Sequence, residues 1–200
     1  MKKDAQTNHD IHQLIKQRWS ARAFSQEPIE LDKILRVLEA ARWAPSSMNQ
    51  QPWRFIIGLN KDETHQKLFD ILVEFNQIWA KAPVLILAIG KTKMNINDEP
   101  NEAYSYDVGQ AVATLALQAT EEDLFVHQMG GFDKGKAMEL FQIPLNYMPL
   151  TILAIGHYGD SDLLPEKIKI LEYSPRVRED LEGIVFSGTF GHKADIFNKK

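Results

Sequence analysis

The segments Pro83–Gly90, PVLILAIG, and Pro149–Gly156, PLTILAIG, decide the class of fold. Each is an unbroken run of aliphatic residues bounded by a proline and a glycine. Apolar runs of about four to eight residues between such breakers indicate strands that are buried on both faces. We interpret the two segments as central strands of one sheet. Nothing around them repeats, so their likeness does not indicate a repeat architecture.

Outward from these strands, apolar residues at helical spacing predict helices, and shorter apolar runs predict two more strands. The expected helices are residues 11–18, 31–41, 68–75, 108–119 and 134–141, and the expected further strands are 53–59 and 124–127. We expect Asn8 or Asp10 to cap the first helix and Asp133 to cap the last. The pattern predicts an α+β fold, a mixed sheet with helices around it, in a single domain of residues 1–200.

Composition excludes several classes of protein. A net charge of −4 makes nucleic acid a poor main partner, because phosphate backbones attract basic surfaces. The absence of cysteine excludes disulfides, cysteine-ligated metals and thiolate catalysis, and the six histidines show no metal-ligand spacing. The longest apolar runs fall far short of the ~20 residues that span a bilayer. We expect no metal and no membrane, and a soluble, cytoplasmic protein.

The last third of the chain is polar and is interrupted by Pro165 and Pro175. It nevertheless contains apolar residues, and these are too many for a solvated tail. They are Val185, Phe186, Phe190 and Phe197. An arm that wraps a partner subunit explains this composition.

Two basic motifs are candidates for holding a phosphate group. In Arg18-Trp19-Ser20-Ala21-Arg22, two guanidinium forks flank a hydroxyl. In Arg176-Val177-Arg178, alternate residues of an extended segment point the same way, so both arginines can converge on one anion. The alternatives are a solvated helix end for the first motif and a charged surface turn for the second.

Two loops are candidates for contacting a planar ligand. The stretch Pro45–Trp53, PSSMNQQPW, carries short hydroxyl and amide side chains that can read the edge of a heterocycle. The stretch His127–Asp133, HQMGGFD, places two glycines between a strand and a helix, where backbone can approach a ligand closely. Ordinary turns explain either loop equally well, and His127 alone favours a structural role.

Together the four motifs resemble the nitroreductase family of flavoproteins, in the same order and over almost the whole chain. The resemblance implies a nitroreductase-like α+β fold with a central mixed, mostly antiparallel sheet surrounded by helices. It also implies an intertwined homodimer with exchanged C-terminal arms and two FMN sites at the interface. No basic residue stands where the family often has one, since Trp79 lies close to that position, and Trp19 replaces a more usual arginine or histidine.

The resemblance assigns roles to individual residues. Arg18, Arg176 and Arg178 would hold the FMN phosphate, and Arg22 would lie toward the pyrimidine side of the flavin. The expected FMN-binding residues are Arg18, Trp19, Ser20, Arg22, Asn76, Gln128, Met129, Gly130, Gly131, Arg176 and Arg178, together with Pro45, Ser46, Ser47, Asn49 and Gln51. Of these, Pro45, Ser46, Ser47 and Asn49 would come from the other subunit. Met129, Gly130 and Gly131 would lie beside N5, with a backbone N–H reaching it.

The implied activity is ping-pong transfer of hydride from NAD(P)H through flavin N5 to a small oxidised acceptor such as a nitroaromatic or a quinone. No catalytic side chain is expected, because the flavin is the reactive group. The same fold also hosts dehalogenases, flavin-destroying enzymes and dehydrogenases of peptide azolines. A different class is an FMN-binding storage or regulatory protein with little turnover, and a third is a dimeric scaffold without a ligand.

Overall fold

The computed structural model describes residues 3–60 and 62–198. Its core is a four-stranded sheet in the order β1-β2-β4-β3. The strands are β1 Trp53–Leu59, β2 Val84–Lys91, β3 Phe125–Met129 and β4 Tyr147–Gly156. The two apolar segments therefore become the neighbouring central strands β2 and β4. The nitroreductase-like α+β class is confirmed, but a mixed sheet was too general a prediction, since all three pairs of described strands are antiparallel.

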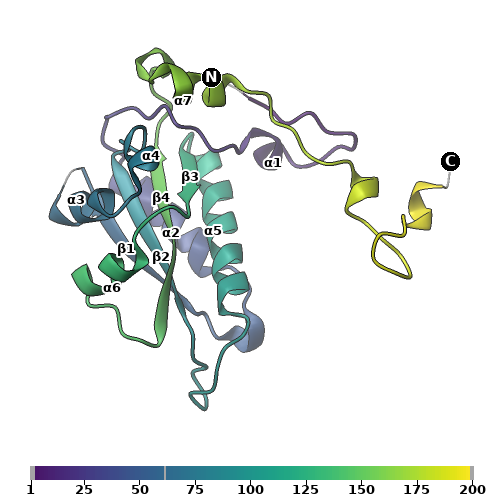
Figure 1. Ribbon diagram of the computed structural model, residues 1–200, viewed down its shortest axis with the longest axis horizontal. Coiled ribbons are helices and arrows are strands. Elements are labelled where there is room, and N and C mark those ends of the chain that lie inside the picture. The colour runs from purple at the N-terminus through teal and green to yellow at the C-terminus, as the bar shows by residue number, and fades with distance from the viewer. Residues whose placement is uncertain (1–2, 61, 199–200) are drawn as a thin grey trace.

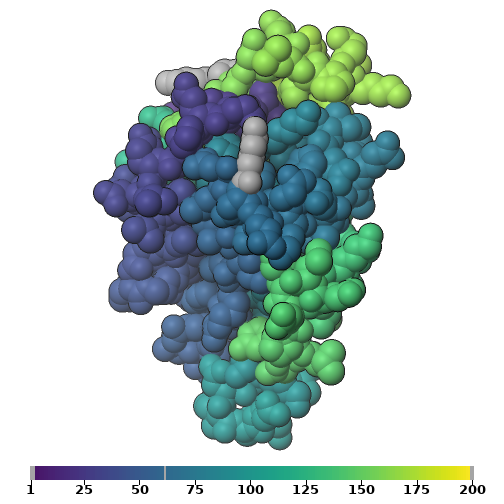
Figure 2. All heavy atoms as spheres, turned by 90° about the vertical axis from the view of Figure 1, so that its left-hand side faces the viewer, coloured from purple at the N-terminus to yellow at the C-terminus, as the bar shows by residue number. Residues whose placement is uncertain are grey.

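Burial on both faces explains the unbroken apolar runs of the central strands. Alternate residues of β2, such as Ile86, lie in a cluster with α2 Leu31–Arg42 and α5 Tyr104–Glu121. The intervening residues, such as Leu87, lie in a second cluster with α3 Glu63–Asp70, α6 Lys134–Leu140 and α7 Glu166–Tyr173. Figure 1 shows α5 along one side of the sheet and α3 and α6 on the other, and Figure 2 looks onto the side where α3 and α6 lie.

A register shift between Ala88 and Ile89 interrupts the pairing of β2 with β4. Ala88 pairs with Thr151 and Ile89 with Pro149, so Leu150 has no partner. A proline cannot donate to a strand ladder and is tolerated in a sheet at such irregularities. The shift therefore allows Pro149 to sit in a central strand.

Two of the predicted helices differ from the structure. The first, α1, covers only Gln13–Gln17, and its N-cap is His12, whose side chain accepts from the Leu14 N–H, so Asn8 and Asp10 are not its cap. The predicted helix 68–75 is two helices, α3 and α4 Glu74–Gln77. The chain breaks between them because Leu72 bridges to Phe132 and the Val73 N–H donates to the Gly131 carbonyl. The predicted cap of α6 is correct, since Asp133 accepts from the Lys136 N–H.

The N-terminal segment before α1 and the C-terminal arm beyond α7 both extend past the sheet and its helices at the upper right of Figure 1. The described part of the C-terminal arm beyond α7 contains the short 3-10 turns Leu181–Gly183 and Asp195–Phe197 and an isolated bridge between Phe186 and Lys193. Phe190 is 96% exposed, and Phe186 packs on it with the ring centroids 5.0 Å apart. An apolar arm of this kind is consistent with the predicted exchange between subunits, which stays a prediction. The predicted domain also includes residues 1, 2, 61, 199 and 200, which lie outside the described residues. In the described part of the chain, no helix is both long and apolar enough to cross a membrane.

Candidate functional site

The two basic motifs from opposite ends of the chain line one cavity of about 230 Å³. The first motif follows α1, and the second follows the proline that ends α7. The cavity is lined by Lys3, Arg18, Trp19, Ser20, Arg22, Leu171, Ser174, Pro175, Arg176 and Arg178. We call it the basic cavity. The structure thus brings together all the residues that the sequence assigned to a phosphate.

The guanidinium groups of the basic cavity repel one another. Burial lowers the pKa of Arg18, and the positive charge of Arg178 lowers it further. Burial likewise lowers the pKa of Arg176, and the positive charges of Arg18 and Arg178 lower it further. Within residues 3–60 and 62–198, none of these three arginines forms an ion pair. Clustered guanidinium groups without carboxylate partners form a site for an anion, and a phosphate offers the matching geometry.

Arg176 also has a structural role that the sequence did not indicate. Its Nη1 donates to the carbonyl oxygens of Lys3, at 2.8 Å, and Lys16, at 2.6 Å. These bonds tie the N-terminal segment to the chain that leaves α7. Among residues 3–60 and 62–198, Arg178 donates only to the neighbouring carbonyl of Val177, so most of its donors have no partner in this part of the chain and can serve a ligand.

Trp19 and Ser20 contribute differently to the same cavity. The Trp19 ring is 5% exposed and packs near Phe125 and Tyr158, with centroid distances of 5.7 and 5.8 Å. Trp19 therefore anchors the motif to the end of β3. Ser20 is half-buried and lines the cavity, where its hydroxyl can supply a short hydrogen bond to an anion.

Arg22 lies over a pair of rings that contact each other at a tilt. Its guanidinium carbon is 5.8 Å from the centroid of the Trp79 ring, and that ring lies 4.3 Å from the His127 ring. His127 Nδ1 lies 2.9 Å from the Ala21 carbonyl oxygen. Burial lowers the pKa of His127 to about 4, with a further contribution from the charge of Arg22. A neutral His127 thus donates to Ala21 and holds the basic motif against β3.

The glycine turn after β3 is shaped by close packing against α4. A Cβ on Gly131 would lie 2.9 Å from Val73 Cγ2 and 3.0 Å from Asn76 Nδ2, whereas a Cβ on Gly130 would meet nothing within 4 Å. Asn76 donates to the Gly131 carbonyl at 3.0 Å and so stabilises the turn from α4. Met129 is buried, while Gln128 and Gly130 are exposed. The backbone at Gly130 is therefore open to a ligand.

The loop before β1 is held in an unusual conformation. Met48, Asn49 and Gln51 have φ angles of 49°, 53° and 47°, a left-handed region that costs non-glycine residues free energy. The surrounding structure compensates through hydrogen bonds to side chains. The Ser47 N–H donates to Asp107 at 3.1 Å, the Gln51 N–H donates to the Ser46 hydroxyl at 3.0 Å, and the Asn95 N–H donates to the Gln50 side chain at 2.7 Å.

This loop presents Pro45, Ser47 and Asn49 to solvent. Strained backbone of this kind, held by its surroundings, is concentrated at binding sites. The supporting residues Asp107 and Asn95 were not foreseen from the sequence. The sequence signal that could have indicated Asp107 is an acidic residue next to the first apolar residue of a long apolar helix.

Within one chain the loop and the basic cavity lie at opposite ends of α5. The loop contacts Asp107 in the first turn of this helix, whereas Trp19 shares a pocket with Thr120 near its end. Thirteen residues of α-helix separate Asp107 from Thr120, which corresponds to about 20 Å. The predicted ligand-contacting residues therefore form two separate groups in one chain.

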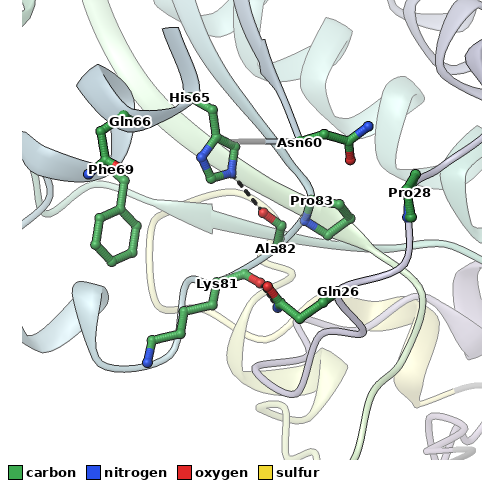
Figure 3. Close-up of a pocket in the computed structure, with 9 residues that line it drawn as sticks. All are labelled: Gln26, Pro28, Asn60, His65, Gln66, Phe69, Lys81, Ala82 and Pro83. Atoms are coloured by element: carbon green, nitrogen blue, oxygen red, sulfur yellow. Dashed lines mark hydrogen bonds between the residues drawn. The ribbon is translucent and has the colours of Figure 1, made fainter. Parts of the chain in front are cut away.

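A cavity larger than the basic cavity lies elsewhere and contains none of the predicted site residues. It has a volume of about 490 Å³ and is lined by Gln26, Pro28, Asn60, His65, Gln66, Phe69, Lys81, Ala82 and Pro83 (Figure 3). His65 Nε2 lies 2.8 Å from the Ala82 carbonyl oxygen, and Gln26 donates to the Lys81 carbonyl. These side chains hold the connection into β2. The smaller basic cavity, with its cluster of like charges, is the better candidate for chemistry.

The sequence profile of the Nitroreductase family matches residues 15–78 and 72–157. These ranges include the basic motif, the strained loop and the glycine turn. The chain belongs to the nitroreductase family. The family assignment made from the sequence is confirmed, and with it the class of enzyme, an NAD(P)H-dependent flavin oxidoreductase.

The chain is also similar to individual proteins and to solved structures. The chain is 32% identical to a 15.4 kDa Mycolicibacterium smegmatis protein, over 70% of this chain and 98% of the other. It is 25% identical to a Bacillus subtilis protein provisionally named NAD(P)H nitroreductase YdgI, over 81% of this chain and 95% of the other. A solved structure described as an oxidoreductase containing FMN superposes with a TM-score of 0.88 at 34% identity, covering 94% of this chain and 96% of the other.

Proposed function

We propose that this nitroreductase-family protein, as one domain of residues 1–200, binds FMN in the basic cavity and passes hydride from NAD(P)H to small oxidised acceptors. One observation carries the proposal. Arg18, Arg176 and Arg178 converge on one cavity, where burial and neighbouring positive charge lower the pKa of Arg18 and of Arg176, and none of the three forms an ion pair with a carboxylate among the described residues. Such a cluster fits a phosphate group. The FMN named for the similar solved structure supports the choice of ligand.

Different residues around the cavity would contact different parts of FMN. Arg18, Ser20 and Arg178 would bind the phosphate. The part of the Arg176 guanidinium that donates to no carbonyl would lie beside them. Arg22 and the turn at Met129–Gly131 would face the ring. The loop residues Pro45, Ser46, Ser47, Asn49 and Gln51 would complete the ring site from a second copy, because they lie too far from the cavity of their own chain. We therefore propose a homodimer with two sites.

When bound, FMN supplies the redox chemistry, accepting hydride at N5 and passing it on to the acceptor. The protein binds and orients it, and no side chain of this chain is assigned a proton transfer. Arg22 would place a positive charge beside the pyrimidine ring. Donor and acceptor would use the same opening in turn, which is ping-pong kinetics. We propose nitroaromatics and quinones as acceptors and the cytoplasm as the location.

An anaerobic absorbance titration tests this function. Purified protein loaded with FMN should lose its flavin absorbance on addition of NADH or NADPH, and should regain it when a quinone or nitroaromatic is added. The donor that bleaches the flavin faster is the preferred one. Bound flavin that neither donor reduces would contradict the enzyme and favour an FMN-binding storage or regulatory protein. Protein that takes up no FMN would overturn the assignment of the cavity.

A further inference from the structure

Glu172 is a carboxylate buried in the last turn of α7, with an exposed fraction of 0%. It lies one turn after Ile168, which is also buried, so it occupies the apolar face of its helix. A buried carboxylate costs free energy unless charged or polar groups compensate for it. Its partners therefore show what it does.

Those partners belong to the basic motif. The Arg22 N–H lies 3.1 and 3.0 Å from the two Glu172 carboxylate oxygens, and the Ala23 N–H donates to Oε1 at 3.3 Å. Arg22 Nη1 lies 3.8 Å from Oε2. Burial raises the pKa of the Tyr158 hydroxyl to about 12, and the nearby Glu172 carboxylate contributes to the rise. One carboxylate thus holds the backbone of Arg22 by hydrogen bonds and lies within ion-pair distance of its guanidinium.

Arg22 is only partly satisfied by this arrangement. Its Nε is buried and has no hydrogen-bond partner among residues 3–60 and 62–198. Burial lowers the pKa of Arg22, and Glu172 opposes that shift. An oriented guanidinium with a free buried donor is preorganised for a ligand that brings an acceptor.

We propose that Glu172 is a positioning residue that holds Arg22 in place for the ring of the bound flavin. The inference rests on the proposed FMN site and adds to it a residue that does not touch the cofactor. Glu172 acts through Arg22, whereas Arg18 and Arg178 act on the phosphate. Loss of the carboxylate should therefore weaken binding of any flavin ring, with or without a phosphate.

Binding of FMN and of riboflavin, which lacks the phosphate, separates the two roles. In Glu172→Gln, a neutral amide replaces the carboxylate that accepts from two backbone N–H donors and faces the Arg22 guanidinium, so Arg22 loses its anchor. We expect the Kd of FMN and the Kd of riboflavin both to rise by about tenfold, the effect of losing one charge-assisted hydrogen bond. The matched control Arg178→Ala should raise the Kd of FMN alone. Fluorescence titration measures both ligands, and circular dichroism confirms that each variant is folded.

Each result has a distinct meaning. Folded Glu172→Gln protein with unchanged Kd values for both flavins would overturn the inference, and a loss confined to FMN would overturn the route through Arg22. If Glu172→Gln does not fold, Glu172→Asp keeps the charge but shortens the side chain. A several-fold rise of both Kd values in that variant supports the inference, and no change overturns it. Wild-type protein that binds neither flavin would instead refute the proposed function.

Discussion

At the scale of single residues, the arginines of the basic cavity differ in what else they hold. Within the described part of the chain, Arg178 donates only to the carbonyl of Val177, whereas Arg176 donates to the carbonyls of Lys3 and Lys16. We expect Arg178→Ala to weaken FMN binding with the free energy of unfolding unchanged. Arg176→Ala should weaken binding and also lower the free energy of unfolding by about 1–3 kcal/mol. Urea unfolding of the two apoproteins measures the difference, and equal stabilities would contradict it.

The second prediction at this scale concerns the protonation of His127. Its pKa is about 4 in the folded chain and about 6.5 when unfolded. Between these values the unfolded chain takes up a proton that the folded chain does not, so its contribution to stability is complete above pH 6.5 and is lost as pH falls toward 4. From pH 6.5 to 5 the loss is about 2 kcal/mol. Urea unfolding at both pH values should show this loss in wild type and a smaller one in His127→Gln. An identical pH dependence in the two proteins would show that His127 titrates normally.

At the scale of elements, the turn after β3 depends on how closely α4 approaches it. Gly131→Ala would push its Cβ into Val73 and Asn76, and we expect a loss of about 1–3 kcal/mol in the free energy of unfolding. Gly130→Ala, at the preceding position, is the control, because its Cβ meets no atom within 4 Å. Thermal or urea unfolding of the apoproteins compares them. Similar losses in both variants would mean that the turn, and not the packing of α4, requires glycine.

The elements also show which features local sequence patterns are sufficient to predict. The strand 53–59 and the cap at Asp133 agree with the structure because each depends on neighbours in the chain. The break between α3 and α4 could not be predicted, since it follows from the contacts of Leu72 and Val73 with the glycine turn far along the chain. Apolar periodicity alone continues through that break.

At the scale of the whole molecule, the separation of loop and cavity predicts a site shared between two chains. One variant, Arg18→Ala with Arg178→Ala, damages the cavity, and another, Ser47→Tyr, fills the exposed loop. Each should bind little FMN by itself. A hybrid dimer of the two variants, isolated with two different tags, should regain one intact site and about half of the wild-type flavin. A hybrid without flavin would contradict a shared site, because each chain would then carry its own damaged one.

The sequence by itself determined the two buried strands and the family, and it singled out the arginines that we propose to bind phosphate. These follow from unbroken apolar runs and from motifs that are each local in the chain. Only the tertiary structure decided that β2 and β4 pair antiparallel, that Arg18 meets Arg178, and that Glu172 is buried beneath Arg22. Pairing and burial of this kind depend on packing between segments far apart in the chain. Local propensity carries no information about that packing, and so a glutamate on a polar-looking helix gave no sign of its role.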